Sequence, residues 1–478
     1  MKQFESFAST RPAAWDRSFA PPALACLALF AALAFNTAVF NDGDTSWHLA
    51  AGRLILHQRS IPSTDAFSFT FAGKPWVAHE WFAEVIMALA FRAAGWSALA
   101  LITGACVAGT LFIVALDGRK RLNPLRLAAV LLIIGLVLMP FTLARPHVLT
   151  WPILALWTVI LLRARDRHHA PPLAAALLMG LWANLHASFL LGLLLVCYFA
   201  LEAFVYEHDR AAQVKHWGLF GLLSVAATLA TPHGVEGLLF PLQVGSMRSL
   251  PLIGEWQATD FRHSPAFDAA LVTGAAALIV ARKRIPLLRL LLIAALTYLA
   301  IKHVRHQPLL AIVGALVLIR VFGPAQQSPG SRSAPLYPAL LAGVAAICIL
   351  RLSIPVQRPD SESNPLTAIS HIPAALHNQP VLNSYSFGGP LILDGIRPFI
   401  DGRGDMYGDA FMFEHRRIME GDVAAFRDAV RHWRIRWAII SPLDPLASRL
   451  VKMPGWQQIY ADKWAVIYVN DAKPAEQG

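Results

Sequence analysis

The feature that most constrains this chain is a series of apolar runs that fills its first 354 residues. A helix of about 20 apolar residues spans the hydrocarbon core of a bilayer, where every backbone polar group must be paired within the chain. We therefore predict an all-α polytopic membrane bundle of about 11 transmembrane helices. The spans are expected near residues 21–40, 97–116, 126–142, 147–163, 171–184, 188–205, 217–231, 267–281, 285–301, 307–322 and 335–354.

The composition agrees with a chain surrounded by lipid. Hydrophobic residues make up 56% and charged residues 15%, whereas a soluble domain carries about 25% charged residues. The net charge of +11 does not predict a nucleic-acid partner, because the charges occupy short clusters between the apolar runs. The four cysteines lie within apolar runs and indicate neither a disulfide framework nor a zinc site.

Loops rich in lysine and arginine alternate with loops that carry few of these residues. Cytoplasmic loops carry an excess of these residues, and the alternation fits a bacterial inner (plasma) membrane protein with a cytoplasmic N-terminus. We read the first apolar run as a retained helix and not as a cleaved signal peptide. The basic loops assigned to the cytoplasm are 119–126, 163–167, 210–215 and 282–284.

The character of the chain changes near Pro355. A polar linker runs to about Asn364, and short apolar runs then alternate with helix-like stretches. This pattern predicts a transmembrane domain over 1–354 and a small extracytoplasmic α/β domain over 355–478. Strands are expected at 380–382, 398–401, 437–440 and 464–470, and helices at 410–419, 423–432 and 445–451.

The first outer loop, residues 41–96, holds the richest polar content. It begins with Asp42 and Asp44, followed by an amphipathic pattern over 47–56. A strand-like run at 66–71 and a turn at 73–75 precede a second amphipathic pattern from His79 to about Ala94. Amphipathic helices of this kind lie in the membrane interface, so we predict two interfacial helices that form a cradle at headgroup depth.

This arrangement resembles the GT-C superfamily of integral-membrane glycosyltransferases, which use polyprenyl-phosphate sugar donors. It is also similar to a group of bacterial membrane proteins. In the superfamily an acidic residue just after the first span is catalytic, two juxtamembrane helices follow it, and a soluble C-terminal domain commonly lies on the same face. The resemblance implies that Asp44 or Asp42 is the catalytic carboxylate here.

The chemistry is consistent with this resemblance. Transfer from a phosphate-linked sugar needs a base for the acceptor hydroxyl and positive charge for the departing phosphate. The alternative is that Asp42-Gly43-Asp44 forms a turn and caps the next helix. Glu80 can similarly favour a helix start through its charge, and His48 and His79 can be packed interfacial histidines.

The other predicted outer loops bring polar residues to the same face. The basic cluster at 302–306 breaks the alternation of charge, which indicates an anionic ligand such as a lipid-linked phosphate. Anchoring to anionic headgroups or capping of helix ends is the alternative. The predicted substrate-binding residues are Glu80, His79, Arg145, His186, Lys302, Arg305 and His306.

Two further features bear on the site. Mg²⁺ and Mn²⁺ prefer oxygen ligands, and the candidates for such a site are Asp42, Asp44, Glu255 and Asp260. The Gly-rich loop 401–408 follows a predicted strand without the spacing of a P-loop or a dinucleotide fingerprint. It is either a tight turn or a loop that faces donor or acceptor.

The sequence thus predicts an enzyme of the cell envelope, a hexosyl or pentosyl transferase. It would move a sugar from a polyprenyl-phosphate donor to a glycan, lipid or protein acceptor on the extracytoplasmic face. A transporter or flippase for a lipid-linked or anionic substrate is the main alternative, although its polar residues should gather near the bilayer midplane. A non-catalytic scaffold fits the polar cluster less well.

Overall fold

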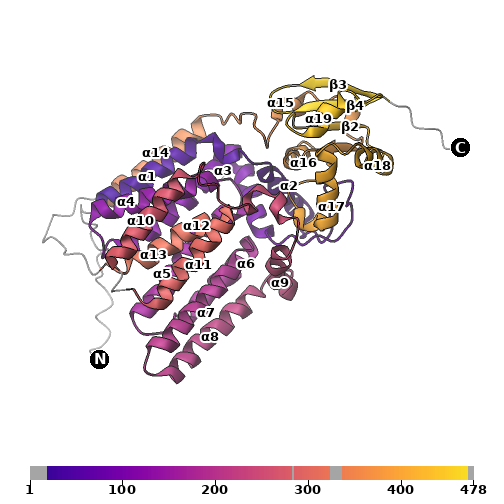
Figure 1. The fold of residues 1–478 in the computed structure, drawn as a ribbon. Helices are drawn as coiled ribbons and strands as arrows, with labels where there is room; N and C mark the ends of the chain where they lie inside the picture. The colour runs from indigo at the N-terminus through magenta and orange to yellow at the C-terminus, as the bar shows by residue number, and fades with distance from the viewer. Residues whose placement is uncertain (1–18, 282–284, 323–335, 472–478) are drawn as a thin grey trace.

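The computed structural model describes residues 19–281, 285–322 and 336–471. Helices dominate the chain up to residue 353, where they form an elongated bundle (Figure 1). A five-residue π-helical turn joins α12 to α13 within one continuous helix. The helices are α1 (Ala20–Phe35), α2 (Asp44–Gln58), α3 (Trp81–Gly118), α4 (Pro124–Leu138), α5 (Pro146–Asp166), α6 (Leu177–Leu185), α7 (Phe189–Tyr206), α8 (Arg210–Thr228), α9 (Gly234–Gly245), α10 (Pro265–Ala281), α11 (Leu287–Lys302), α12 (Gln307–Leu309), α13 (Ala315–Ile319) and α14 (Leu336–Ser353).

A helix lies at each of the eleven positions where the sequence predicts a span. Within the described residues, four are long and apolar enough to cross a membrane by themselves: Trp81–Gly118, Pro124–Phe141, Pro146–Asp166 and Phe189–Tyr206. The chain is a multi-pass membrane protein. Five other apolar helices among the described residues have 10–17 residues, fewer than the roughly 20 that a straight span needs, so the total of eleven spans stays a prediction.

The predicted interfacial segment contains two helical pieces. The first is α2, and the second is the N-terminal part of α3, which the non-helical residues Ala94 and Gly95 separate from the rest of the helix. Gly95 has a φ of +58°, a conformation that favours glycine. The break therefore falls between the amphipathic pattern that ends near Ala94 and the apolar run that begins at residue 97.

The C-terminal region forms a four-stranded mixed sheet of order β1-β2-β4-β3. β1 pairs with β2 in parallel, and β4 lies antiparallel to both β2 and β3. The strands are β1 (Val381–Asn383), β2 (Trp437–Ile440), β3 (Trp456–Ala461) and β4 (Val466–Asn470). The helices are α15 (Leu366–Ser370), α16 (Gly388–Leu393), α17 (Gly404–Met419), α18 (Val423–Trp433) and α19 (Pro445–Leu450).

Two predicted strands are wrong, at 66–71 and 398–401. The Asp65 carboxylate accepts hydrogen bonds from the Phe67 and Ser68 amides, which turns the chain instead of extending it. The two segments lie against each other, since Thr70 donates its hydroxyl to the Phe399 carbonyl at 2.7 Å. They do not pair as strands of a β-sheet. The edge strand β3 and the helix α9 were not predicted. Most side chains of β3 are exposed, so no alternating apolar pattern marks it.

Charged side chains gather at the end of the bundle where α3 and α5 finish. Asp117 pairs with Arg163 and Arg320, and Asp166 pairs with Arg121 and Arg320. These ion pairs join loops that the positive-inside rule assigns to the cytoplasm. The predicted cytoplasmic cluster at 282–284 lies outside the described residues.

The orientation of the bundle can be tested with single cysteines in a chain whose native cysteines are replaced. Both Lys120 and Gln458 are exposed. We expect an impermeant maleimide to label Gln458→Cys in intact cells, and Lys120→Cys only after the membrane is permeabilised, because the basic loop is held inside. Labelling of Lys120→Cys in intact cells would reverse the predicted topology.

Candidate active site

The segment between α1 and α2 places two carboxylates at one end of the bundle. The Asp42 carboxylate accepts the Asp44 amide N–H at 3.1 Å, so Asp42 stabilises the turn. Asp44 is the first residue of α2, and its side chain is 19% exposed. The alternative reading of the Asp-Gly-Asp stretch as a turn thus describes Asp42, whereas Asp44 is the acidic residue in the first turn of α2.

Arg145 lies between these carboxylates. It precedes α5 in an extended conformation, as the following Pro146 favours. The neighbouring Ala144 amide donates to the Val39 carbonyl at 2.8 Å, which ties the start of α5 to the short 3₁₀ turn that follows α1. The Arg145 guanidinium contacts Asp42 at 3.3 Å and Asp44 at 2.9 Å.

Glu255 extends this cluster to a second arginine. Its carboxylate lies 3.4 Å from the Arg145 guanidinium and 2.7 Å from that of Arg305. Arg305 also covers the Trp256 ring at 4.4 Å. The segment 254–257 is held there because the Val304 amide donates to the Gln257 carbonyl at 2.9 Å. A continuous series of ion pairs, Asp44–Arg145–Glu255–Arg305, therefore crosses the site; we call it the ion-pair chain.

The electrostatics distinguish the two carboxylates of the ion-pair chain, Asp44 and Glu255. Burial raises the pKa of Asp44, Arg145 lowers it, and Asp42 and Glu255 raise it again, which leaves a pKa of about 7. Burial also acts to raise the pKa of Glu255, but Arg305 and Arg145 outweigh it and lower that pKa to about 2. Asp44 can therefore exchange a proton near neutral pH, while Glu255 stays ionised.

A second cluster surrounds Glu80. Its carboxylate lies 3.5 Å from the Nε2 of His48, 3.6 Å from that of His79 and 3.4 Å from that of His186. Burial raises the pKa of Glu80 to about 8 and lowers that of His79 to about 4. At neutral pH this cluster consists mainly of uncharged groups.

Glu84 supports the second cluster and was not predicted. Its carboxylate lies 3.2 Å from the Nδ1 of the buried His48. Glu80 and Glu84 are four residues apart, which puts them on one face of a helix. The four-residue spacing of Glu80 and Glu84, together with His48 in the preceding amphipathic helix, is the sequence signal that could have identified Glu84.

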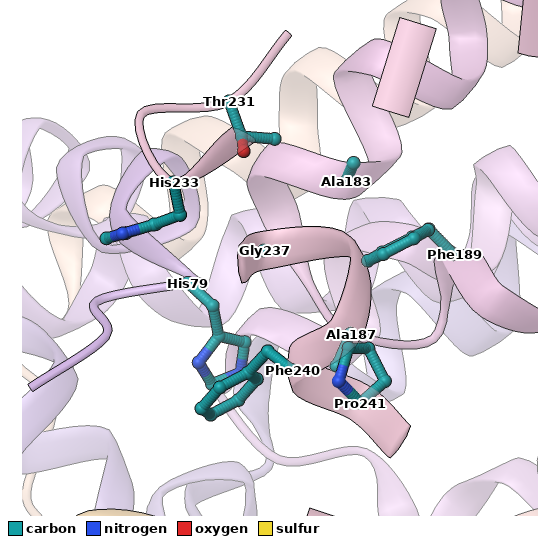
Figure 2. A pocket seen from close by; sticks show the side chains of 9 residues that line it. All are labelled: His79, Ala183, Ala187, Phe189, Thr231, His233, Gly237, Phe240 and Pro241. Carbon is teal, nitrogen blue, oxygen red and sulfur yellow. The ribbon is translucent and has the colours of Figure 1, made fainter. Parts of the chain in front are cut away.

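A pocket opens beside His79. Figure 2 shows the His79 imidazole next to the Phe240 ring of α9, with Thr231 and His233 on the other side of the pocket. The centroids of the two rings are 4.3 Å apart. The helix α9 exposes Val235, Leu239 and Leu242 on its outer side. It thus separates the Glu80 cluster from the surroundings of the bundle.

The C-terminal region lies beside α2 (Figure 1), and the close approach of two of its glycines makes it a wall of the site. A Cβ atom on Gly402 would lie 1.8 Å from the Asp44 carboxylate, and one on Gly389 would lie 2.0 Å from the Gly43 carbonyl oxygen. The Gly-rich loop 401–408 therefore faces Asp44 at close range. Its residues 401–403 form the turn that precedes α17, whereas residues 404–408 already belong to this helix, which is interrupted at Gly408.

Arg403 anchors this wall. Its guanidinium pairs with Asp401 at 2.6 Å and with Asp65 of the first outer loop at 2.8 Å, and all three side chains are buried. The next acidic residue, Asp405, shares a small pocket with Glu80. The sequence singled out this loop but could not show that Asp65 is its partner.

Some predicted site residues lie apart from the ion-pair chain. Lys302 is exposed at the end of α11. His306 packs its ring near Trp256, with centroids 6.2 Å apart, and faces the Leu299 carbonyl. The other predicted residues, Glu80, His79, Arg145, His186 and Arg305, belong to one of the two clusters.

The four carboxylates proposed to hold Mg²⁺ or Mn²⁺ do not fit such an ion. Asp42, Asp44 and Glu255 each face the Arg145 guanidinium, which takes the centre that an ion would need. The exposed Asp260 binds the Arg262 amide and His263 within its own turn. Within the described ranges, no three His, Cys, Asp or Glu side chains are arranged to hold a metal ion.

No family model matches the chain, and neither does any curated protein. Among solved structures, the chain is similar to the oligosaccharyltransferase of Archaeoglobus fulgidus, crystallised with Zn and sulfate. The TM-score is 0.53 at 12% identity, over 95% of this chain and 73% of that one. ArnT from Cupriavidus metallidurans, bound to undecaprenyl phosphate, aligns with a TM-score of only 0.34 at 11% identity, over 95% and 98% of the two chains. The likeness to the oligosaccharyltransferase confirms the predicted resemblance to GT-C glycosyltransferases at the level of the fold.

Proposed function

We propose that this chain is a membrane glycosyltransferase that moves a hexose or pentose from a polyprenyl-phosphate donor to an acceptor hydroxyl on the extracytoplasmic face. The observation that carries this proposal is the ion-pair chain, which holds a carboxylate of pKa about 7 and two arginines within one site. It supplies the base and the phosphate-stabilising charge that sugar transfer requires.

In the proposed reaction, Asp44 accepts the proton of the acceptor hydroxyl. The hydroxyl oxygen forms a bond to the anomeric carbon, and the bond between that carbon and the phosphate oxygen breaks. The electron pair leaves with the polyprenyl phosphate, whose growing negative charge Arg305 and Arg145 stabilise. The proton stays on Asp44 until solvent takes it up, so atoms and charge balance.

The location of the charged groups favours this reaction over transport. Asp44, Arg145, Glu255 and Arg305 all lie at or beyond helix ends. A transporter would present such groups on broken helices near the bilayer midplane. The neighbouring helix α2 and the N-terminal part of α3 suit a donor whose phosphate lies at headgroup depth.

The proposal is tested by transfer of label from polyprenyl-phosphate sugars, offered one at a time, in membranes with and without the chain. We expect chain-dependent incorporation of label with one hexosyl or pentosyl donor. The matched control is the Asp44→Asn variant at equal expression. Incorporation that does not depend on the chain with any donor would reject the function.

The pH profile provides a separate prediction. Below a pKa of about 7 the Asp44 carboxyl carries a proton and cannot accept another. We therefore expect kcat/KM to rise with pH to a plateau above about pH 8, and to fall about tenfold per pH unit on the acidic side. Measurement of initial transfer rates from pH 5 to 9 checks this, and a flat profile over that range would contradict Asp44 as the base.

A further inference from the structure

The surroundings of Arg145 carry an inference that goes beyond the reaction type. Each of its three guanidinium nitrogens lies within ion-pair distance of a different carboxylate: Nε is 3.3 Å from Asp42, Nη2 is 2.9 Å from Asp44 and Nη1 is 3.4 Å from Glu255, to which it donates a hydrogen bond. These carboxylates come from two segments that are more than two hundred residues apart in the sequence. Three converging carboxylate oxygens around one positive centre are also what a hard divalent cation selects.

We infer that the Arg145 guanidinium replaces a divalent cation in this site, so that its carboxylates are organised, and the departing phosphate is stabilised, without a metal ion. The statement about the phosphate rests on the proposed function, whereas the statement about the carboxylates does not. Arginine suits this role because its planar group offers donors in fixed directions and stays protonated at any physiological pH.

The position of Arg145 is held from several sides. Pro146 fixes the start of α5, and the Ala144 amide is bonded to Val39. Although burial opposes it, the nearby Asp42 and Asp44 carboxylates raise the pKa of Arg145 further above its usual range. Its side chain is only 20% exposed. A divalent ion on these carboxylates would lie next to a permanent positive charge, and the repulsion would weaken its binding.

The charges remaining in the site agree with this assignment. One guanidinium cannot neutralise three carboxylates, and the second arginine, Arg305, pairs with Glu255. The remaining excess negative charge falls on the pair of aspartates. It contributes to the raised pKa of Asp44, which is the property that a general base at neutral pH needs.

The experiment measures Mn²⁺ binding to the purified full-length chain in detergent, from the electron paramagnetic resonance signal of the free ion. We expect the wild type to bind Mn²⁺ only weakly, and Arg145→Ala to bind one ion at least tenfold more tightly. In the double variant Arg145→Ala/Asp44→Asn, the loss of the Asp44 carboxylate should abolish that gain in Mn²⁺ affinity. Arg305→Ala is the matched control, because Glu255 still faces Arg145 there, and it should bind Mn²⁺ as weakly as the wild type.

Two results would overturn the inference: a wild-type chain that binds Mn²⁺ as tightly as Arg145→Ala, or a folded Arg145→Ala chain without the gain. The wild type also provides a test that needs no variant. Once a donor is known, its transfer rate should change less than twofold in EDTA, and a loss restored by Mn²⁺ would contradict the inference. Mn²⁺ binding can be measured whether or not transfer is found, so failure of the proposed function is distinguishable from failure of this inference.

Discussion

Asp44→Asn is expected to reduce sugar transfer by about 10²- to 10⁴-fold, the usual contribution of a positioned general base. Asparagine preserves the size of the side chain and keeps a polar oxygen near the Arg145 guanidinium, which lies 2.9 Å from Asp44. It cannot take the acceptor's proton. We therefore expect the loss in kcat, with donor binding and folding largely retained. The measurement is the initial rate at saturating donor in membranes with equal amounts of each variant.

Asp42→Asn is the matched control for this prediction. The carboxylate of Asp42 accepts the Asp44 amide N–H, and the side-chain oxygen of asparagine can do the same, so a smaller effect is expected. Full activity of Asp44→Asn with loss in Asp42→Asn would exchange the two roles. Full activity of both variants would reject the carboxylate mechanism.

Arg403→Met is expected to lower the free energy of unfolding by about 3–5 kcal/mol, the usual effect of removing one partner from a buried ion pair. The side chains of Arg403, Asp401 and Asp65 are all at most 1% exposed, so two carboxylates would be left in the interior without their cation. Because Asp65 belongs to the first outer loop, the contact between this loop and the C-terminal region should loosen. Thermal unfolding and limited proteolysis of the purified chain measure these effects.

Two further variants make the Arg403 result specific. Arg416 pairs with Glu420 on an exposed surface, where an ion pair contributes at most about 1 kcal/mol, so Arg416→Met should behave like the wild type. Adding Asp65→Asn to Arg403→Met should recover part of the stability, because one uncompensated charge is removed. Equal stability of Arg403→Met and the wild type would show that the buried triad does not hold the two regions together.

The sequence alone was sufficient for the features that depend on local composition. Lipid accepts only segments whose backbone groups are paired internally, so apolar runs predict helices at the right positions. The end of the amphipathic pattern near Ala94 and the start of the next apolar run at residue 97 likewise indicate the break in α3. Asp42 and Asp44 could be placed after the first helix because they follow directly from its end.

The tertiary structure alone decided how the polar groups combine. Arg145 meets Glu255 across 110 residues of sequence and Arg403 meets Asp65 across 338, contacts that depend on how helices and loops pack and not on local propensity. The same packing places the predicted substrate-binding residue Arg145 among three carboxylates. It also left Lys302 exposed. Charges that look alike in the sequence differ in their surroundings here, because only the packed structure determines which of them share a buried, weakly screened environment.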